Sequence, residues 1–177
     1  MFAIHATELL KWNRMMNLTA IKLPMDVAVK HFVDSLAPAP LIPRGACLLD
    51  IGSGGGFPGI PLKIAIPSLS VTLIDSSRKK VSFQNHMIRT LKLGNIEARH
   101  IRVQELAKDK HSAGGFDVIL SRAFSALDTF ALSALPLIAK HGQIIALKGK
   151  ISQGEIESAH SKIGKELFSM TVKRYRL

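Results

Sequence analysis

A glycine-rich stretch constrains this chain more than any other feature. Residues 47–51 form a short apolar run, Cys-Leu-Leu-Asp-Ile, which is typical of a strand covered on both faces. The next eight residues, 52–59, contain five glycines, more than an ordinary turn needs. Glycine permits positive φ angles and lets the backbone approach a ligand without a Cβ in the way. Pro58 can occupy the first turn of a helix whose amino end presents unpaired N–H groups, so the stretch predicts a strand, a ligand-binding turn and a helix.

The spacing of these glycines separates two classes of cofactor. Dinucleotide enzymes use G-x-G-x-x-G, and Gly54, Gly56 and Gly59 have that spacing, but they begin two residues too late after the strand. Counted from the end of the strand, residues 50–56 resemble D-x-G-x-G-x-G, the first motif of class I methyltransferases. An acid at Asp50 would repel a pyrophosphate, whereas it would attract the ammonium and sulfonium groups of S-adenosylmethionine (SAM).

A second acid ends the next predicted strand, residues 71–75. The carboxylate of Asp75 can accept hydrogen bonds from both hydroxyls of a ribose. Both cofactor classes use such an acid, so Asp50 is the residue that distinguishes between the two classes. A purely structural glycine turn is the alternative. We expect SAM as the cofactor, with Asp50, Gly52, Gly54 and Asp75 among its contacts.

Strand and helix patterns alternate from residue 45 onward, which is typical of a doubly wound, mostly parallel sheet. We therefore expect the class I SAM-dependent methyltransferase fold, an α/β fold, over residues 45–177. Its predicted strands are residues 47–51, 71–75, 96–101, 116–120, 143–147 and 167–172.

A short helical extension, residues 1–44, precedes this domain. Leu9, Trp12 and Met16 share one face of a first helix over residues 1–16. Pro24 opens a second helix. The predicted apolar face of that second helix consists of Val29, Phe32, Val33 and Leu36. A proline-rich link, residues 37–43, joins the extension to the sheet domain.

The charge of the chain favours a nucleic-acid partner. It carries 24 Lys and Arg against 13 Asp and Glu, a formal net charge of +11. Each contact between a cation and a phosphate releases counterions, whereas a small metabolite needs no such excess; a generally basic surface is the alternative. The candidate RNA contacts are Lys11, Arg14, Lys79, Lys80, Lys148 and Lys150.

Other features of the composition indicate the compartment in which the protein acts. Cys47 is the only cysteine, which excludes a disulfide within the chain and fits a reducing compartment. The sequence has no signal-peptide pattern and no apolar run of the ~18 residues that span a bilayer. We expect a cytoplasmic monomer without a membrane partner.

Five motifs along the chain resemble the signatures of one family. They are Trp12-Asn13 with Asn17-Leu18-Thr19-Ala20, residues 31–36, residues 50–61, residues 121–124 and Ala146-Leu147-Lys148-Gly149. In this order they resemble the RsmG family, also called GidB (glucose-inhibited division protein B), over nearly the whole chain. The resemblance implies transfer of a methyl group from SAM to N7 of one guanine in bacterial 16S ribosomal RNA. By position, it implies cofactor contacts at Gly52, Phe57, Gln104, Glu105 and Arg122, with Asp75 as the ribose acid.

The chain departs from the family at both ends. Family members usually have more helix before the Trp-Asn motif, and they continue past the last basic segment into another strand. That strand normally inserts antiparallel between the fifth and the sixth, so we expect the sixth strand here to be unpaired or re-paired, with an exposed edge.

Methylation of N7 requires no general base, because N7 carries a free lone pair. Catalysis would then depend on orientation and electrostatics. Arg122, predicted at the carboxyl end of the fourth strand with its side chain in the cofactor cleft, is the candidate catalytic residue, and a surface position is its alternative. Seven histidines show no metal-ligand spacing, so we expect no metal, and we expect His31 to be structural.

Two other functions remain open at this point. One is a SAM-dependent methyltransferase that acts on another substrate. The other is an RNA-binding module that has the fold and has lost turnover, which the short termini favour.

Overall fold

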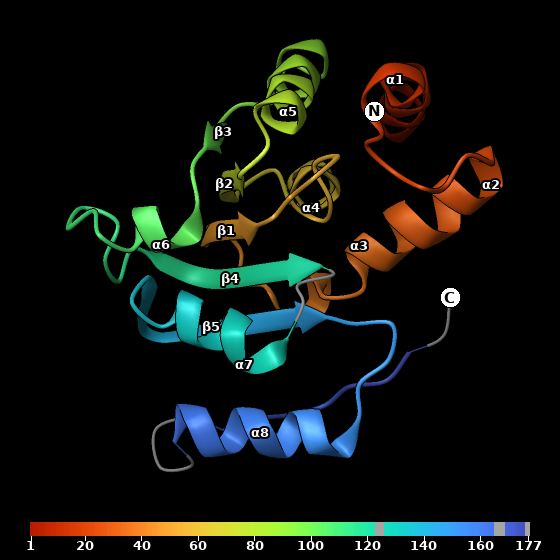
Figure 1. Ribbon diagram of the computed structural model, residues 1–177. Helices are drawn as coiled ribbons and strands as arrows, with labels where there is room; N and C mark the ends of the chain where they lie inside the picture. Colours follow the sequence, from red (N-terminus) through yellow and green to blue (C-terminus); the bar gives the residue numbers. More distant parts are fainter. Residues whose placement is uncertain (123–125, 165–168, 176–177) are drawn as a thin grey trace.

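A five-stranded parallel sheet forms the centre of the computed structural model, which describes residues 1–122, 126–164 and 169–175 (Figure 1). Its order is β3-β2-β1-β4-β5, and every neighbouring pair is parallel. The strands are β1 (Cys47–Ile51), β2 (Ser70–Asp75), β3 (Ile96–His100), β4 (Phe116–Arg122) and β5 (Ile138–Leu147). The doubly wound α/β fold that the alternating pattern predicts is confirmed.

The strand order places a crevice at the carboxyl ends of β1 and β4. The chain runs from β1 outward through β2 to β3 and then returns to the other side of β1 with β4. Helices that follow strands on the two sides of such a point lie on opposite faces, which leaves a gap between their amino ends. The glycine-rich turn follows β1 directly, so it opens onto this crevice.

Helices cover both faces of the sheet (Figure 1). One face packs against α4 (Gly59–Ala65) and α5 (Arg78–Thr90), and the other packs against α6 (Val103–Leu106) and α7 (Leu127–Ala134). Alternation along β1 explains the two layers, because Leu48 belongs to the first core and Leu49 to the second. α8 (Gln153–Ile163) lies beyond α7.

The N-terminal extension shares the first of these cores. It consists of α1 (Phe2–Met16), α2 (Pro24–Val27), the π-helical segment η1 (Ala28–Val33), α3 (Asp34–Leu36) and the 3-10 turn η2 (Ala39–Leu41). Leu9, Val27 and Phe32 are buried in the same cluster as Leu48 and Phe83. The boundary at residue 45 therefore marks a change in secondary structure and no break in the hydrophobic core.

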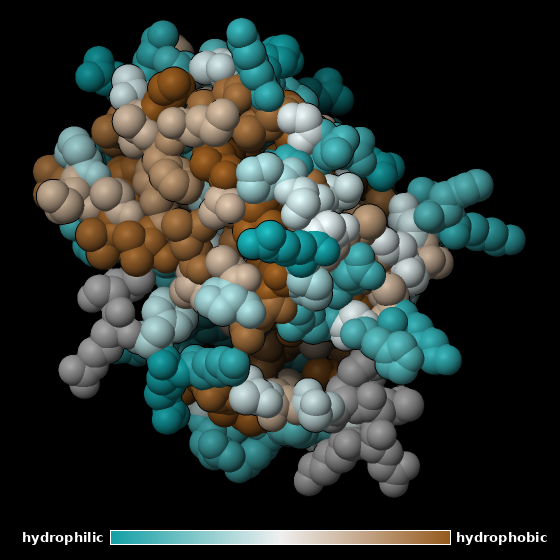
Figure 2. Space-filling model, turned by 180° about the vertical axis from the view of Figure 1, so that it is seen from behind, coloured by the Kyte–Doolittle hydropathy of each residue, from teal (hydrophilic) through white to brown (hydrophobic). Residues whose placement is uncertain are grey.

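Several large apolar side chains of this extension remain exposed. They are Met1, Ile4, Met15, Leu23, Met25 and Val33. Figure 2, seen from behind, shows hydrophobic surface gathered on the side that carries α1 and α2 in Figure 1. The extension thus buries one face against the sheet domain and leaves apolar side chains on the other.

Two expectations about the elements are wrong in part. Val33, predicted on the apolar face of the second helix, is 53% exposed, because this segment turns the face with Val27, His31 and Phe32 toward the core instead. The last predicted strand, residues 167–172, is not formed at residues 169–172, and residues 167–168 lie outside the described residues.

Candidate functional site

The glycine-rich turn adopts backbone angles that favour glycine. Gly52, Gly54 and Gly56 have φ values of 73°, 56° and 84°. A Cβ at Gly52 would meet nothing within 4 Å, so the space over the turn is free for a ligand. At Gly59 a Cβ would instead lie 2.3 Å from a methyl group of Leu73, so this glycine permits close packing of α4 on β2. The turn therefore uses its glycines for two purposes, an open cradle and a close helix contact.

Asp50 lies beneath this turn and is completely buried. Its Oδ2 accepts the N–H of Gly59 at 2.8 Å, while no described residue pairs with its Oδ1. Burial raises the pKa of Asp50 to about 7, which the hydrogen bond from Gly59 only partly offsets. Asp50 thus fixes the amino end of α4 from a position outside the lining of the cavity, and its contact with the cations of SAM stays a prediction.

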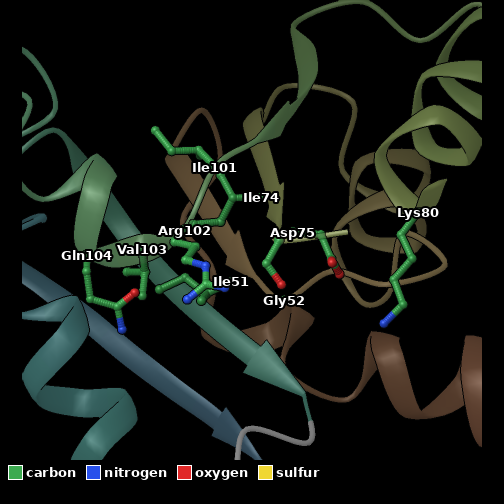
Figure 3. A pocket seen from close by; sticks show the side chains of 10 residues that line it. Ile51, Gly52, Ile74, Asp75, Lys80, Ile101, Arg102, Val103 and Gln104 are labelled. Carbon is green, nitrogen blue, oxygen red and sulfur yellow. The ribbon is translucent and has the colours of Figure 1, made fainter. Parts of the chain in front are cut away.

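A cavity of about 470 Å³ opens where β1 and β2 end (Figure 3). Gly52, Asp75 and Gln104, three of the predicted cofactor contacts, line it. Both carboxylate oxygens of Asp75 already accept backbone N–H groups, Oδ2 from Gly54 at 2.9 Å and Oδ1 from Ser77 at 2.8 Å. Each carboxylate oxygen has a second lone pair, so hydroxyls of a ribose remain acceptable as further donors.

The other predicted cofactor contacts lie outside the lining of this cavity. Glu105 is exposed on α6, one residue beyond Gln104. Phe57 is only 4% exposed, and its ring is stacked between the rings of His5 and His31, with centroids at 4.7 Å and 4.6 Å. Phe57 therefore builds the wall behind the turn, and a direct contact of its side chain with cofactor stays a prediction.

Arg122 ends β4, as predicted, but its guanidinium is held by the N-terminal extension. It donates to Nδ1 of His31 at 3.0 Å, to Oδ2 of Asp34 at 3.3 Å and to the carbonyl of Lys30 at 3.2 Å. It also lies over the ring of Phe57, 5.1 Å from the centroid. The side chain is 19% exposed, so it is a fixed group and not the freely pointing one that we expected from its place in the cleft. Ala123 and Phe124 of the same motif lie outside the described residues.

The two histidines of the stack are neutral at pH 7. Burial lowers the pKa of His5 and the pKa of His31 to about 4 each. Nε2 of His31 lies 2.7 Å from the hydroxyl of Thr19, and its Nδ1 accepts from Arg122, so His31 connects the N-terminal extension to the end of β4.

Sequence reasoning missed two polar residues that support the site. Gln84 is fully buried and donates through Nε2 to Oγ of Ser53 at 2.9 Å and to the carbonyl of Gly54 at 2.8 Å. A glutamine on the apolar stripe of its helix was the available signal. His5 is fully buried four residues before Leu9, on the predicted apolar face of α1. The lining of the cavity also includes residues that strand ends alone did not single out. They are Ile51, Ile74, Ser76, Ile101, Arg102 and Val103.

The structure divides the six cations that were predicted to contact RNA. Lys11, Arg14, Lys79 and Lys150 are exposed. Lys80 lines the cofactor cavity, where its side chain extends from α5 (Figure 3). Lys148 is paired with Glu155 and only 17% exposed, so it is not free to contact a phosphate.

Two kinds of feature are absent from the described residues, a metal-binding cluster and a membrane-spanning helix. No group of three or more His, Cys, Asp or Glu side chains could hold a metal ion there. Within the same part of the chain, no helix is long and apolar enough to cross a membrane.

Comparisons with known proteins agree on one family. Residues 1–175 match the family model described as rRNA small subunit methyltransferase G. The protein "Ribosomal RNA small subunit methyltransferase G" of Geotalea uraniireducens (strain Rf4) is 51% identical over 158 residues, which cover 89% of this chain and 71% of the relative. The protein of that name from Geobacter metallireducens is 48% identical with the same coverage. The crystal structure of a SAM-dependent methyltransferase from Aquifex aeolicus superposes with a TM-score of 0.62 over 78% of this chain and 82% of that one; its identity of 16% shows the fold alone.

Proposed function

We propose that this chain, which belongs to the rRNA small subunit methyltransferase G (GidB) family, transfers a methyl group from SAM to N7 of a guanine in bacterial 16S ribosomal RNA. The observation that carries the proposal is the glycine-rich turn after β1, which opens onto a cavity lined by Asp75 in a chain that matches this family over 175 residues. The family name is the reason to propose RNA as the substrate. The geometry of the site is the reason to propose SAM as the cofactor.

The described residues fit SAM. The cradle over Gly52 is free of protein atoms, and a Cβ at Gly54 would meet only one atom, at 3.9 Å. Asp75 lines the cavity, where its carboxylate can accept ribose hydroxyls, and the unpartnered Oδ1 of Asp50 lies beneath the same turn. Lys80 and Arg102 add two cations to the wall of the cavity. When bound, SAM supplies a methyl group made electrophilic by the positive sulfur.

Residues of the chain need only orient the two reactants. The lone pair of guanine N7 forms the new bond to carbon while the bond from carbon to sulfur breaks, and no proton has to leave in that step. A general base is therefore not required, and the chemistry depends on alignment and charge. Arg122 cannot serve as a base, because its guanidinium stays protonated. It is suited to hold a carboxylate or a guanine oxygen in line.

The partner we propose is 16S rRNA, free or within the small ribosomal subunit, met by a monomer in the cytoplasm. The net charge of +11 supports it. Lys11, Arg14, Lys79 and Lys150 are the exposed cations that would contact phosphates. Lys80 would act within the cofactor cavity instead.

Two measurements test the proposal. Calorimetric titration should give micromolar affinity for SAM and for its demethylated product, and no comparable affinity for NAD. Mass mapping of 16S rRNA should show one guanine that carries a methyl group in cells with the gene and lacks it in cells without the gene. Tight binding of NAD without SAM would overturn the cofactor class. SAM binding with turnover on a different substrate would leave the assignment of the fold and the cofactor unchanged. It would overturn the assignment of RNA as the substrate.

A further inference from the structure

We infer that His31 and Asp34 are positioning residues, which hold the guanidinium of Arg122 in the orientation that methyl transfer requires. The inference rests on the proposed function. Arg122 comes from the end of β4, while both acceptor side chains come from the N-terminal extension, 91 and 88 residues earlier in the chain. The extension would thus be part of the catalytic machinery and more than a cover for the sheet.

The ring of His31 is fixed from two sides. A guanidinium can only donate, so Nδ1 of His31 accepts from Arg122 and the proton of the neutral ring is on Nε2. Nε2 then donates to Oγ1 of Thr19 at 2.7 Å. Thr19 is held in turn by Asn13, whose side chain accepts its N–H and donates to its carbonyl, each at 2.9 Å. A chain of hydrogen bonds therefore connects α1 to Arg122.

Asp34 fixes the guanidinium from another direction. Its Oδ2 accepts from Nη1 of Arg122, and its Oδ1 accepts from the hydroxyl of Tyr175 at 2.8 Å. The side chains of Asp34 and Arg122 are only 18% and 19% exposed, so solvent screens this pair less than a surface pair. Tyr175 thereby brings the C-terminal segment to the same point.

Part of the guanidinium of Arg122 has no acceptor among the described residues. Nη1 gives both of its hydrogens to Asp34 and Lys30, and Nη2 gives one to His31. Among the described residues nothing accepts from Nε or from the second hydrogen of Nη2. A flexible arginine loses rotamer entropy when it is ordered. Three acceptors and the ring of Phe57 provide that order before a reactant binds.

The first test measures order directly and needs no activity. In ¹⁵N NMR spectra, the Nη hydrogens of Arg122 in the parent chain should be resolved and slow to rotate. His31→Gln keeps a group near Nε2 but removes the acceptor for Arg122, so these signals should average. Freely rotating signals in the parent would overturn the inference, whatever the enzyme does.

The second test is a double-mutant cycle on small ribosomal subunits that lack the modification. His31→Gln and Asp34→Asn should each lower kcat about 10-fold, while the KM for RNA changes less than 3-fold. His31→Asn, whose amide oxygen lies near the position of Nδ1, should recover part of the rate. In an Arg122→Ala background, His31→Gln should cost no further rate, because its effect acts through Arg122. Losses that multiply in the double variant would overturn the inference.

Matched controls separate positioning from packing. Glu8→Gln removes the ion pair of α1 with His86 of α5 and should lower the Tm without the loss in kcat. Asp26→Asn removes an exposed ion pair with Lys30 in the same segment and should change neither the Tm nor kcat. A kcat loss in Glu8→Gln equal to that in His31→Gln would overturn the positioning role. Absence of methylation by the parent chain would count against the proposed function alone, since the NMR test still decides the positioning.

Discussion

Arg122 carries the sharpest prediction at the scale of a single residue. Arg122→Ala should lower kcat/KM on small subunits at least ~10²-fold, the order expected when a reactant is misoriented. Arg122→Lys should not restore the rate, because an ammonium cannot contact Nδ1 of His31 and Oδ2 of Asp34 with the geometry of a fork. Steady-state kinetics with labelled SAM measures both variants.

The structure also changes what we expect of the stability of these variants. Removing the guanidinium leaves Asp34 with Tyr175 as its remaining partner, so the Tm of Arg122→Ala should fall by a few degrees while the fold survives. An unchanged rate on subunits would remove Arg122 from the site. A variant that fails to fold would show that this cluster serves stability first.

Sequence alone predicted the residues that a local motif defines and missed those that only the fold brings together. Asp50, Gly52 and Asp75 follow from strand ends and glycine spacing. His5 contacts the carbonyl of Gly55 across 50 positions of sequence, and no local pattern reveals such a contact. For the same reason, no local pattern revealed the three acceptors of Arg122, since each depends on how the N-terminal helices pack.

The glycine-rich turn gives a prediction at the scale of an element. Gly59→Ala places a Cβ 2.3 Å from Leu73 and 2.9 Å from Oδ2 of Asp50, so it should cost about 1–3 kcal/mol of stability. Gly54→Val adds a branched side chain where φ is 56°, a strain of about 1–2 kcal/mol, and fills the cofactor cradle. Both should lower the Tm in the absence of SAM. Only Gly59→Ala should still gain stability when SAM is added, as a thermal shift assay can measure.

Gly149→Ala is the matched control for this pair. A Cβ at Gly149 would meet nothing within 4 Å, so the Tm and its response to SAM should stay as in the parent. Retention of the SAM response in Gly54→Val would contradict the assignment of the cradle.

Element types were more predictable than element registers. Alternating apolar runs indicated β1 to β5, because a buried parallel strand needs apolar side chains on both faces. β5 begins at Ile138, five residues before the predicted start, and its first half contains the polar Lys140 and His141. The π-helical winding of η1 was equally invisible, because a 3.6-residue period was assumed throughout.

At the scale of the whole molecule, the excess of positive charge predicts salt-dependent binding of RNA. The logarithm of the affinity should fall against the logarithm of salt concentration with a slope near −0.7 per phosphate contact on single strands. Lys11→Ala, Lys79→Ala and Lys150→Ala should each reduce that slope by about one unit or less. Lys148→Ala should leave the slope unchanged and lower the Tm, because Lys148 is paired with Glu155. An affinity independent of salt, measured by filter binding, would count against phosphate contacts.

Three buried groups connect the stability of the molecule to pH. The pKa values of His5 and His31 fall from 6.5 to about 4 on folding, so their contribution is complete above pH 6.5 and is lost as the pH falls toward 4. The pKa of Asp50 rises from 3.8 to about 7, so its contribution is complete below pH 3.8 and is lost as the pH rises through 7. The histidines and Asp50 therefore act in opposite directions over the same window.

Between pH 5 and 6, the unfolded chain holds two more protons on His5 and His31 and one fewer on Asp50, a net excess of one. The free energy of unfolding should therefore rise with pH by about 1.4 kcal/mol per unit. Urea titrations followed by the fluorescence of Trp12 measure this slope, above the range in which the exposed carboxylates titrate. His5→Phe should bring the slope close to zero, and Asp50→Asn should about double it. A slope that neither substitution alters would show that these buried groups do not control the pH dependence.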